Sequence, residues 1–592
     1  MTVDGWITAA VIAAVLVALV RQWASPWAIV LGGTLALLIL GVLTPQQAFA
    51  GFSNPAPITV AALYVLAAGI EKTGVLTSVF ERTLGARGHY RRPLSRLLLP
   101  TMGASAFLNN TPIVAMLIPQ ISSWSERRGL SASKFLMPVS FAALTGGMVT
   151  VIGTSTNLVV SGQMLEMGMT EIGFFEIGML GLPITLAALA FLVLAAPRLL
   201  PSRRSAREEM EGEGRSFSTE MIVQPGGVVD GKTVEQARLR ALPGLFLTSV
   251  DRGDTVIAPV RPDTVLRGGN RLHFVGSVAK VVDAQAMAGL QSAELKHVLD
   301  LDSPTVTYFE AVIGPESPLV GQTLREAGFR ATYQAAVLGI HRSGQLLEGK
   351  LGGQPIRVGD TLILVADPDF RERWRNRSDF LLVANLAGEP PVPSAHKGWI
   401  PVTVLLLVVV AATFGIMPIL QGAVLGAIVL IAAGVLTPME ARRSIDVEVI
   451  LVIAAAFGLA AAMETTGLAA TIAGGMVSAV GGFGQVGVLL GLVATTMLMT
   501  EMITNNAAAL LMLPIAVAGA TSVGLDPRGV AIAVAVAASA SFLTPIGYQT
   551  NMMVYGPGGY RFTDFVRLGW PLTLIVVIII VVLTPILWPS IR

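Results

Sequence analysis

Two polar interruptions within long apolar stretches constrain this chain more than any other feature of its sequence. One is Ala106-Phe-Leu-Asn-Asn-Thr-Pro112, which places two amides and a hydroxyl among apolar residues, and Thr504-Asn-Asn-Ala507 repeats the arrangement in the second half. Polar backbone at membrane depth is tolerated only where it lines a cavity within the protein. The interruptions therefore predict two related halves that face one polar centre, which is typical of a transporter.

Composition indicates a membrane protein and excludes several functions. Of the 592 residues, 53% are hydrophobic and 13% are charged, and the mean hydropathy of +0.69 is too high for a soluble globular protein. The net charge of +2 gives no reason to expect nucleic-acid binding. Because the chain has no cysteine, disulfides, thiolate metal sites and cysteine nucleophiles are excluded. No cleavable signal peptide is expected, since residues 1–5 carry Asp4 and no basic residue.

The apolar stretches predict two transmembrane repeats, residues 1–200 and 398–592. Each repeat contains five apolar runs of spanning or near-spanning length and one apolar hairpin around its Asn-Asn pair. The ten runs begin near Trp6, Trp27, Pro57, Phe135, Phe174, Trp399, Ile419, Val449, Val530 and Leu568. Between the repeats, charged and β-branched segments punctuated by glycine and proline predict a soluble insertion.

The distribution of basic residues predicts the topology, because lysine and arginine concentrate in cytoplasmic loops. Basic pairs such as Arg91-Arg92 and Arg442-Arg443 lie in loops, whereas residues 44–56 and 162–174 contain neither lysine nor arginine. The best arrangement has both termini outside, ten crossings and a cytoplasmic insertion, in a plasma membrane of bacterial type. The first hairpin then enters from the cytoplasm and the second from the outside. Arg528 does not fit this pattern.

An internal repeat supports the same count of crossings. Gly41-Val-Leu-Thr-Pro45 returns as Gly434-Val-Leu-Thr-Pro438, and Gly153-Thr-Ser-Thr-Asn157 returns as Gly547-Tyr-Gln-Thr-Asn551, with offsets between 393 and 396 along the chain. With five crossings per repeat, the second copy must be inverted relative to the first. Many secondary transporters use inverted repeats with a midplane site formed by broken helices.

The predicted fold class is therefore a polytopic α-helical membrane protein. It has two inverted repeats of five transmembrane helices, each with one re-entrant hairpin, and a cytoplasmic α/β insertion. In this arrangement residues 74–87 form an amphipathic arm on the cytoplasmic surface, and residues 467–480 are its outer counterpart.

The insertion has a repeat of its own, at a constant offset of 90 residues. Gly231-Lys-Thr233 matches Gly321-Gln-Thr323, and Gly269-Asn270 matches Gly359-Asp360. Each copy ends in an alternating strand pattern. The repeat predicts two small α/β modules, at residues 216–290 and 304–370.

The breaks in the membrane segments suggest the chemistry of the site. A broken helix exposes N–H groups at one half-helix, which suit an anion, and C=O groups at the other, which suit a small cation such as sodium. Asparagine, serine and threonine side chains extend both roles. The residues expected to bind the anion are Asn109, Asn110, Thr111, Thr154, Ser155, Thr156, Asn157, Asn505, Asn506, Gln549, Thr550 and Asn551. The alternative is that these side chains only hold helices together.

At this point the residues resemble a known family. Ala106–Pro112, Gly153–Asn157, Thr504–Ala507 and Pro545–Asn551 are similar to the paired Ser-Asn-Thr hairpin tips and Gly/Thr-x-x-Asn breaks of the divalent anion:sodium symporters. The insertion resembles two copies of the C-terminal regulatory domain (TrkA-C or RCK) of potassium-conductance regulators. The chain departs from the symporter pattern at three positions. Asparagine stands where serine is usual at 109 and 505, and alanine stands where threonine is usual at 507.

The resemblance implies a homodimer in the lipid bilayer that works by an elevator movement with Na⁺ as the coupling ion. It also implies cytoplasmic modules that bind a nucleotide or the transported anion. The positions that it assigns to sodium are Ser105, Asn109, Asn110, Gly153, Glu501, Thr504, Asn506 and Gly547. An intramembrane carboxylate usually marks an ion pathway. We therefore predict that Glu501 either ligates the second sodium or makes coupling proton-dependent, the alternative being a glutamate that snorkels to the surface or bonds a neighbouring helix.

The leading prediction is a sodium-coupled symporter of a small divalent anion. Sulfate is favoured over dicarboxylates, because no lysine or arginine lies in the breaks to hold a second carboxylate. The alternatives are a di- or tricarboxylate transporter of the same fold, a proton-coupled anion transporter and a ligand-gated channel. An enzyme is not expected, since the chain lacks cysteine and has no intramembrane histidine.

Overall fold

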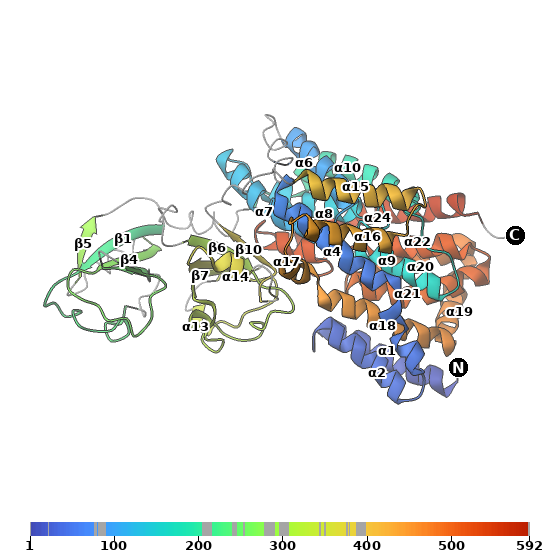
Figure 1. Ribbon diagram of the computed structural model, residues 1–592, viewed down its shortest axis with the longest axis horizontal. Helices are drawn as coiled ribbons and strands as arrows, with labels where there is room; N and C mark the ends of the chain where they lie inside the picture. The colour runs from blue at the N-terminus through green and yellow to red at the C-terminus, as the bar shows by residue number, and fades with distance from the viewer. Residues whose placement is uncertain are drawn as a thin grey trace.

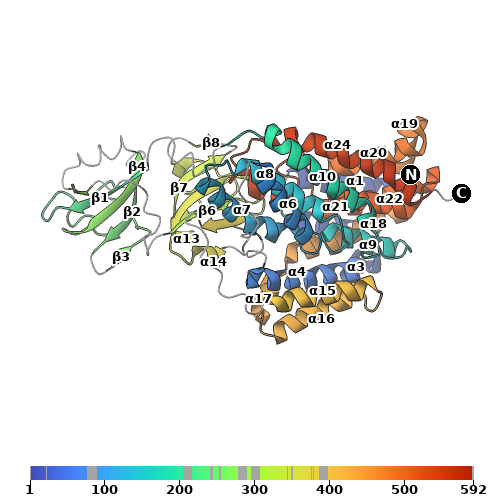
Figure 2. The ribbon, with the colours of Figure 1, turned by 90° about the horizontal axis from the view of Figure 1, so that it is seen from above.

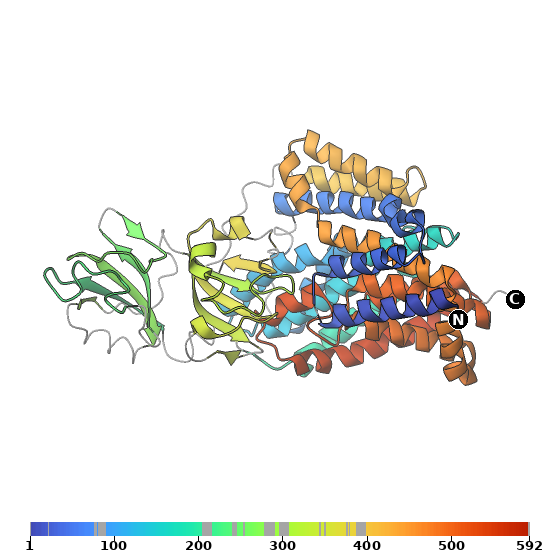
Figure 3. The same cartoon turned by 90° about the horizontal axis from the view of Figure 1, so that it is seen from below.

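The computed structural model describes residues 2–21, 23–75, 80, 90–203, 216–239, 245–252, 255–277, 290–294, 307–342, 345–347, 351–374, 377, 379–385 and 398–589. It consists of a helical body and two β-sheets. In Figures 1, 2 and 3 the sheets lie at one end of the helical body, whereas α1 starts and α24 ends at the opposite end.

The helical body is formed by the two ends of the chain. The N-terminal helices are α1 (Val3–Arg21), α2 (Pro26–Ile39), α3 (Pro45–Ser53), α4 (Pro55–Thr73), α6 (Arg91–Ser105), α7 (Asn110–Arg127), α8 (Ser133–Gly146), α9 (Ser155–Glu166) and α10 (Gly178–Leu199). The C-terminal helices are α15 (Trp399–Thr413), α16 (Ile419–Ala432), α17 (Pro438–Ser444), α18 (Val447–Thr465), α19 (Leu468–Val480), α20 (Gly484–Thr500), α21 (Asn505–Val523), α22 (Pro527–Ala538), α23 (Gln549–Tyr555) and α24 (Phe562–Leu587).

Length and composition of these helices confirm a polytopic membrane protein. Among the described residues, six helical stretches are long and apolar enough to cross a membrane, and several shorter apolar helices accompany them. The predicted arm at residues 74–87 lies largely outside the described residues, whereas its proposed counterpart forms α19. Arg528, which did not fit the charge pattern, forms an ion pair with Glu176 at 2.6 Å.

Identical local sequences begin two helices in the same way. The Thr44 and Thr437 hydroxyls each accept a hydrogen bond from the third residue of the helix that follows, and the side chain of that residue caps the threonine in return. A proline occupies the first helical position in both, where its missing N–H costs nothing. Helices α2 and α16 end just before these caps at Gly41 and Gly434, which have φ values of 77° and 66°.

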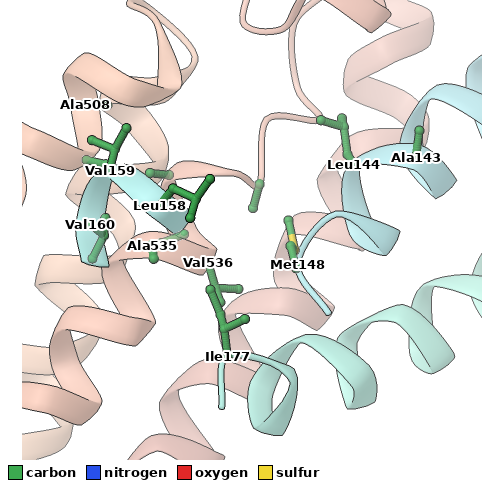
Figure 4. Close-up of a cluster of buried hydrophobic side chains, with 14 of the residues drawn as sticks. Ala143, Leu144, Met148, Leu158, Val159, Val160, Ile177, Ala508, Ala535 and Val536 are labelled. Carbon is green, nitrogen blue, oxygen red and sulfur yellow. The ribbon is translucent and has the colours of Figure 1, made fainter. Parts of the chain in front are cut away.

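Four helices are interrupted inside the body. The chain leaves the helical conformation between α6 and α7, between α8 and α9, between α20 and α21, and between α22 and α23. These interruptions coincide with the two Asn-Asn pairs and with the two Gly-x-x-x-Asn segments of the sequence. The buried apolar faces next to them are closely packed. Figure 4 shows Leu158 and Val159 of α9 near Ala508 of α21 and Ala535 of α22.

The two sheets are formed by the insertion. The first contains β1 (Ser216–Val223), β2 (Leu245–Asp251), β3 (Val256–Ile257), β4 (Arg271–Ser277) and β5 (Leu290–Glu294), in the order β3-β2-β4-β1-β5. The second contains β6 (Thr307–Val312), β7 (Ala335–Arg342), β8 (Gln345–Leu346), β9 (Thr361–Ala366) and β10 (Leu382–Asn385), in the order β10-β6-β9-β7-β8, with the short helices α13 (Phe329–Tyr333) and α14 (Phe370–Trp374).

The two sheets share one mode of strand pairing. Every strand pair in the described residues is antiparallel. Parallel pairing needs a crossover of a dozen or more residues, usually a helix, whereas β2 and β3 or β7 and β8 are joined by short turns. Both sheets also extend past the predicted ends at residues 290 and 370, because β5 pairs with β1 and β10 pairs with β6.

The offset of 90 residues corresponds to matching contacts in the two sheets. The guanidinium of Arg252 donates to the Val265 carbonyl at 2.9 Å, and that of Arg342 donates to the Pro355 carbonyl at 2.7 Å. In the second sheet Arg342 also forms an ion pair with the buried carboxylate of Asp360, at 2.6 Å. The matching residue of the first sheet is an asparagine.

The second sheet packs directly on the helical body. Val312 of β6 and Leu382 and Ala384 of β10 are buried in the same apolar cluster as the membrane helices. Strand β10 contacts α7, and a Cβ atom added to Gly556, at the end of α23, would collide with the Thr361 hydroxyl of β9. Ala258, which follows β3 of the first sheet, packs on apolar residues of the second sheet, among them Ile363 and Val365 of β9. Figures 1 and 2 show this order of helical body, second sheet and first sheet.

Candidate substrate and ion site

Four half-helices begin next to one another inside the helical body. They are α7, α9, α21 and α23, and they start at the residues that the sequence singled out. The residues before three of them, Thr154, Thr504 and Tyr548, have extended backbone with ψ near 149°, 144° and 142°. The first N–H groups of a helix have no partner within it and carry partial positive charge. Helices α7, α9 and α21, each of 12 or more residues, therefore bring their N-terminal N–H groups to one region, where the Thr504 hydroxyl caps that of Ala507.

Hydrogen bonds join the tip of the first hairpin to the break of the second half. The Asn110 amide, at the start of α7, donates to the Tyr548 hydroxyl at 2.9 Å. Next to it, the Thr111 hydroxyl donates to the Gln549 side-chain oxygen at 3.1 Å. These residues are separated by 438 positions along the chain, so only the tertiary fold brings them together.

The second hairpin tip is joined to the first break in the same crosswise manner. The Asn505 amide donates to the Thr156 hydroxyl at 2.6 Å. The Asn506 oxygen accepts hydrogen bonds from Thr156 at 3.1 Å and from Ser155 at 3.2 Å. Residues from both ends of the chain thus share one polar centre. Asn109, the first amide of its pair, instead lies against Tyr64 of α4.

The side-chain NH2 groups of two residues expected to bind the anion donate to the backbone of their own breaks. The Asn157 amide donates to the carbonyls of Gly147 and Thr150 at 3.1 and 2.9 Å. The Asn551 amide donates to the equivalent carbonyls, at 2.9 and 3.2 Å. Both asparagines therefore fix the shape of a break. Thr550 is also engaged, because its hydroxyl lies 2.9 Å from that of Ser140.

Oxygen atoms gather around Gly153 in the first half. A Cβ atom added to Gly153 would lie 2.5 Å from the Gly147 carbonyl oxygen and 3.0 Å from that of Ala106. A Cβ atom added to the neighbouring Gly147 would lie 2.9 Å from the Asn110 side-chain oxygen. The Ser105 hydroxyl also contacts this Asn110 oxygen. This set of uncharged oxygens fits Na⁺, because unwound carbonyls coordinate sodium in transporters with broken helices.

The matching place in the second half holds a carboxylate. One oxygen of Glu501 accepts the backbone N–H of Leu543 at 2.8 Å, and the other accepts that of Thr544 at 3.0 Å. A Cβ atom added to Gly547 would lie 2.8 Å from the second oxygen and would collide with the Ser541 hydroxyl. Glu501 therefore bonds the neighbouring break rather than snorkelling to the surface. Its second oxygen still faces the space beside Gly547.

The structure also adds residues that the sequence analysis did not select. The hydroxyl of Tyr548 is bonded to Asn110, the hydroxyl of Thr150 to the Ala106 carbonyl, and the hydroxyl of Ser140 to Asn551. Tyr548 could have been selected from the internal repeat, which aligns it with the predicted site residue Thr154. Ser140 lies within an uninterrupted apolar helix, so no local pattern marks it.

Comparison with known proteins assigns the chain to a family. The sequence profile described as "Citrate transporter" matches residues 15–537, and the profile described as "Sodium:sulfate symporter transmembrane region" matches residues 504–592. The chain belongs to the citrate transporter family. It is therefore an integral membrane protein with a role in transport, and an enzymatic role is unlikely on this basis.

Several relatives of this transporter match along most of their length. A "Putative sulfur deprivation response regulator" of Chlamydomonas reinhardtii is 34% identical over 557 residues, which cover 92% of this chain and 95% of the relative. An uncharacterised transporter of Synechocystis is also 34% identical, covering 96% and 95%. "Sodium/sulfate cotransporter 2" of Chlamydomonas reinhardtii is 25% identical over 743 residues, covering 90% and 83%. Together these similarities support an anion transporter.

Proposed function

We propose that the protein is a secondary transporter that couples the uptake of a small divalent anion, preferably sulfate, to the sodium gradient. The observation that carries this proposal is the crosswise bonding of Asn110 to Tyr548 and of Asn505 to Thr156, at the starts of half-helices from both ends of the chain. Unpaired N–H groups and neutral side-chain donors suit an oxyanion. The relatives named as sodium/sulfate cotransporters are consistent with this chemistry.

The coupling ion is proposed to bind on the oxygen-lined sides of the same breaks. The first set is Ser105, Asn110 and Gly153, and the second is formed by Glu501 and Gly547. Bound sodium would supply positive charge next to the anion. The protein's own residues would orient both ions, because each hairpin tip provides donors on one side and acceptors on the other.

Transport is proposed to use inverted repeats and an elevator movement. The matched caps at Thr44 and Thr437, and the matched contacts of Asn157 and Asn551, support the repeat. In this proposal the hairpins and broken helices carry both ions past a static part of the protein. The protein works as a homodimer in a plasma membrane of bacterial type, with its termini outside and its sheets in the cytoplasm.

The insertion is proposed to regulate transport through TrkA-C-like modules that bind a nucleotide or the transported anion. The second sheet touches α7 and the end of α23, and both of these helices begin at the polar centre. A ligand that favours one position of the sheet can therefore bias transport. The variant Gly556→Ala, which places a Cβ atom against Thr361, is expected to alter transport kinetics, and adding Thr361→Gly is expected to restore them. Unchanged kinetics in Gly556→Ala would contradict regulation through this contact.

A second candidate function is the transport of di- or tricarboxylates. The match of the citrate transporter profile to residues 15–537 favours it. Both candidates share the same site, so the experiment must compare substrates directly.

The test is uptake by purified protein in proteoliposomes, with labelled sulfate, succinate and citrate, and with sodium or proton gradients imposed separately. The proposal predicts saturable sulfate uptake that depends on the sodium gradient and that succinate and citrate inhibit weakly. Carboxylate uptake in preference to sulfate would establish the second candidate. Uptake driven by a proton gradient alone would replace sodium by protons as the coupling ion, and uptake that does not saturate would indicate a channel.

A further inference from the structure

Tyr548 lies where residues from the four half-helices meet. Its hydroxyl accepts a hydrogen bond from Asn110 at the start of α7. Thr154, which precedes α9, and Asn505, which begins α21, lie beside the same hydroxyl. One phenol oxygen therefore faces donors from both ends of the chain, although Tyr548 itself belongs to the second half.

The residue that corresponds to Tyr548 in the first half is Thr154. Both precede a half-helix with nearly the same backbone, φ −145° and ψ 149° at Thr154, and φ −146° and ψ 142° at Tyr548. Neither side chain caps its own helix. Threonine is common at this position and tyrosine is not. Local helix capping therefore does not explain the tyrosine, which puts an aromatic ring where the first half has a short side chain.

Thr154 provides an independent indication of a ligand. Its side chain is 2% exposed, and its hydroxyl finds no hydrogen-bond partner among the residues that the structure describes. An unpaired buried hydroxyl is costly, so such a group usually serves a ligand or a water molecule. The Thr154 hydroxyl lies near the Tyr548 hydroxyl without meeting hydrogen-bond geometry, so it can bond a ligand there.

The donors around this position suit a compact anion. The amides of Asn110 and Asn505 each have a second N–H besides the one bonded to Tyr548 or Thr156. The hydroxyls of Thr154 and Tyr548 lie nearby, and each has a proton to donate. A tetrahedral oxyanion carries both charges on one group, so one cluster of donors can bind it. A dicarboxylate carries its charges several bonds apart, and a buried carboxylate without partners is strongly disfavoured. The four breaks contain no lysine or arginine that could hold a second carboxylate.

We propose that Tyr548 is the specificity-determining residue that restricts this transporter to compact tetrahedral oxyanions. Its ring occupies the space into which an extended carboxylate would reach, and its hydroxyl donates to the bound anion. The inference rests on the proposed function as an anion transporter, and it assigns the choice between sulfate and carboxylates to one side chain.

Two substitutions distinguish the contribution of the Tyr548 ring from that of its hydroxyl. Tyr548→Phe keeps the ring and removes one donor, so sulfate affinity is expected to fall about tenfold without any gain for succinate. Tyr548→Thr reproduces the residue of the first half, keeps a hydroxyl and removes the ring. It is expected to shift the ratio of sulfate to succinate affinity by about tenfold or more toward succinate. Both ratios are measured by competition against labelled sulfate in proteoliposomes.

The matched control is Tyr90→Phe, which removes a tyrosine hydroxyl at the start of α6, where the ring contacts Phe135 and Lys134. Its ratio of sulfate to succinate affinity is expected to equal that of the wild type. Thermal unfolding verifies that each variant is folded. An unchanged ratio in Tyr548→Thr, or an equal gain for succinate in Tyr548→Phe, would overturn the inference. If Tyr548→Thr does not fold, Tyr548→Ser takes its place with the same expectation. Absence of sulfate uptake by the wild type would instead refute the proposed function.

Discussion

The two halves of the polar centre have the same backbone design but different charge. In each half an asparagine amide, Asn157 or Asn551, donates to two carbonyls of the break that precedes it. One turn before the hairpin tips, the first half has Ser105 and the second has Glu501. The serine hydroxyl contacts other oxygen atoms, whereas the glutamate accepts two backbone N–H groups.

This difference teaches that the shape of a broken helix and the ion that it binds are determined separately. The amides fix the shape in both halves by the same contacts. The side chain at the base of each hairpin tip then determines the local charge. A cluster of uncharged oxygens has no net charge, so positive charge comes only from a bound cation. A carboxylate inside a membrane protein instead adds a negative charge to the site. We therefore expect the halves to respond differently to sodium and to pH.

The largest effect is expected when the amides that link the halves are removed. Asn110→Ala loses the bond to Tyr548 and one oxygen of the first cluster, and Asn506→Ala loses two bonds to the first break. Each is expected to reduce sulfate uptake by about 100-fold or more, since about 1 kcal/mol is lost per bond and the site is no longer organised. Uptake in proteoliposomes measures this.

The control for these variants is Thr471→Ala, which removes an exposed hydroxyl that bonds only its own helix, α19. It is expected to transport like the wild type. Equal amounts of each protein are compared. If both asparagine variants also transported normally, the binding site would lie elsewhere and the two halves would not share a centre.

The next-largest effect is expected at Ser105 and Glu501, the residues one turn before the two hairpin tips. Ser105→Ala is expected to weaken sodium activation of uptake and to leave its pH dependence unchanged, because no titratable group is altered. Glu501→Gln keeps the shape of the side chain but replaces one acceptor by a donor that faces a backbone N–H. Uptake measured across pH and sodium concentration distinguishes the roles of Glu501. Weaker sodium activation identifies a sodium ligand, lost pH dependence identifies a proton site, and wild-type behaviour in both eliminates a coupling role.

A smaller effect is expected at the two structural amides. Asn157→Ala and Asn551→Ala each remove the side-chain donor that serves two carbonyls of the break, which costs about 1–3 kcal/mol of stability. Thermal unfolding in detergent is expected to shift in both variants, and more in Asn551→Ala, because this variant also loses the hydrogen bond that Ser140 donates to Asn551. Thr521→Ala, whose hydroxyl bonds only its own helix, is the control. A shift in only one of the two variants would show that the backbone design is not shared.

The smallest effect concerns Glu448, an acidic residue of the second half that lies near Glu316 of the second sheet. Helix α18 has Glu448 in its first turn, whereas the first turn of α4 has no acidic residue. Desolvation and the nearby Glu448 carboxylate raise the pKa of Glu316 in the second sheet to about 8. A carboxyl whose pKa is raised by folding binds a proton more tightly in the folded state, so its contribution is present at low pH and is lost as pH rises toward 8.

The wild type is therefore expected to lose about 1–3 °C of unfolding temperature between pH 6 and pH 9 relative to Glu316→Gln, which stays neutral throughout. The effect is small because the Glu316 side chain is only partly desolvated, so that solvent still screens the repulsion. Parallel curves for the two proteins would show that the carboxylates do not interact at this contact.

The positions of the breaks could be predicted from the sequence, because helix termination is a local property. Helices α7 and α21 begin within the two Asn-Asn pairs, and α9 begins in the Gly153–Asn157 segment, as expected. The residues that hold the breaks open were predicted only as anion ligands. Asn157 and Asn551 instead bond carbonyls seven and ten residues earlier, which depends on how the chain turns within each break.

The two sheets show the limits of local patterns in another way. The offset of 90 residues predicted two modules, and alternating residues predicted their strands. The extension of the second sheet to β10 followed from pairing with β6, and its contact with the helical body depends on Val312 and Leu382, which are buried in the apolar cluster of the membrane helices. A strand of four residues carries too little pattern to show its partner, since register is set by the neighbouring strand and the surface beneath it.

The sequence by itself determined that this chain lies in a membrane, that its helices break at four polar segments, and that these segments occur in two related pairs. Those features depend on residue type and on spacing within a few turns of helix. Only the tertiary structure decided that each hairpin tip bonds the break of the other half, that Glu501 is held by Leu543 and Thr544, and that Tyr548 reaches the shared centre. These contacts join segments from tens to several hundred residues apart, and packing of the whole helical body is what brings them within hydrogen-bonding distance.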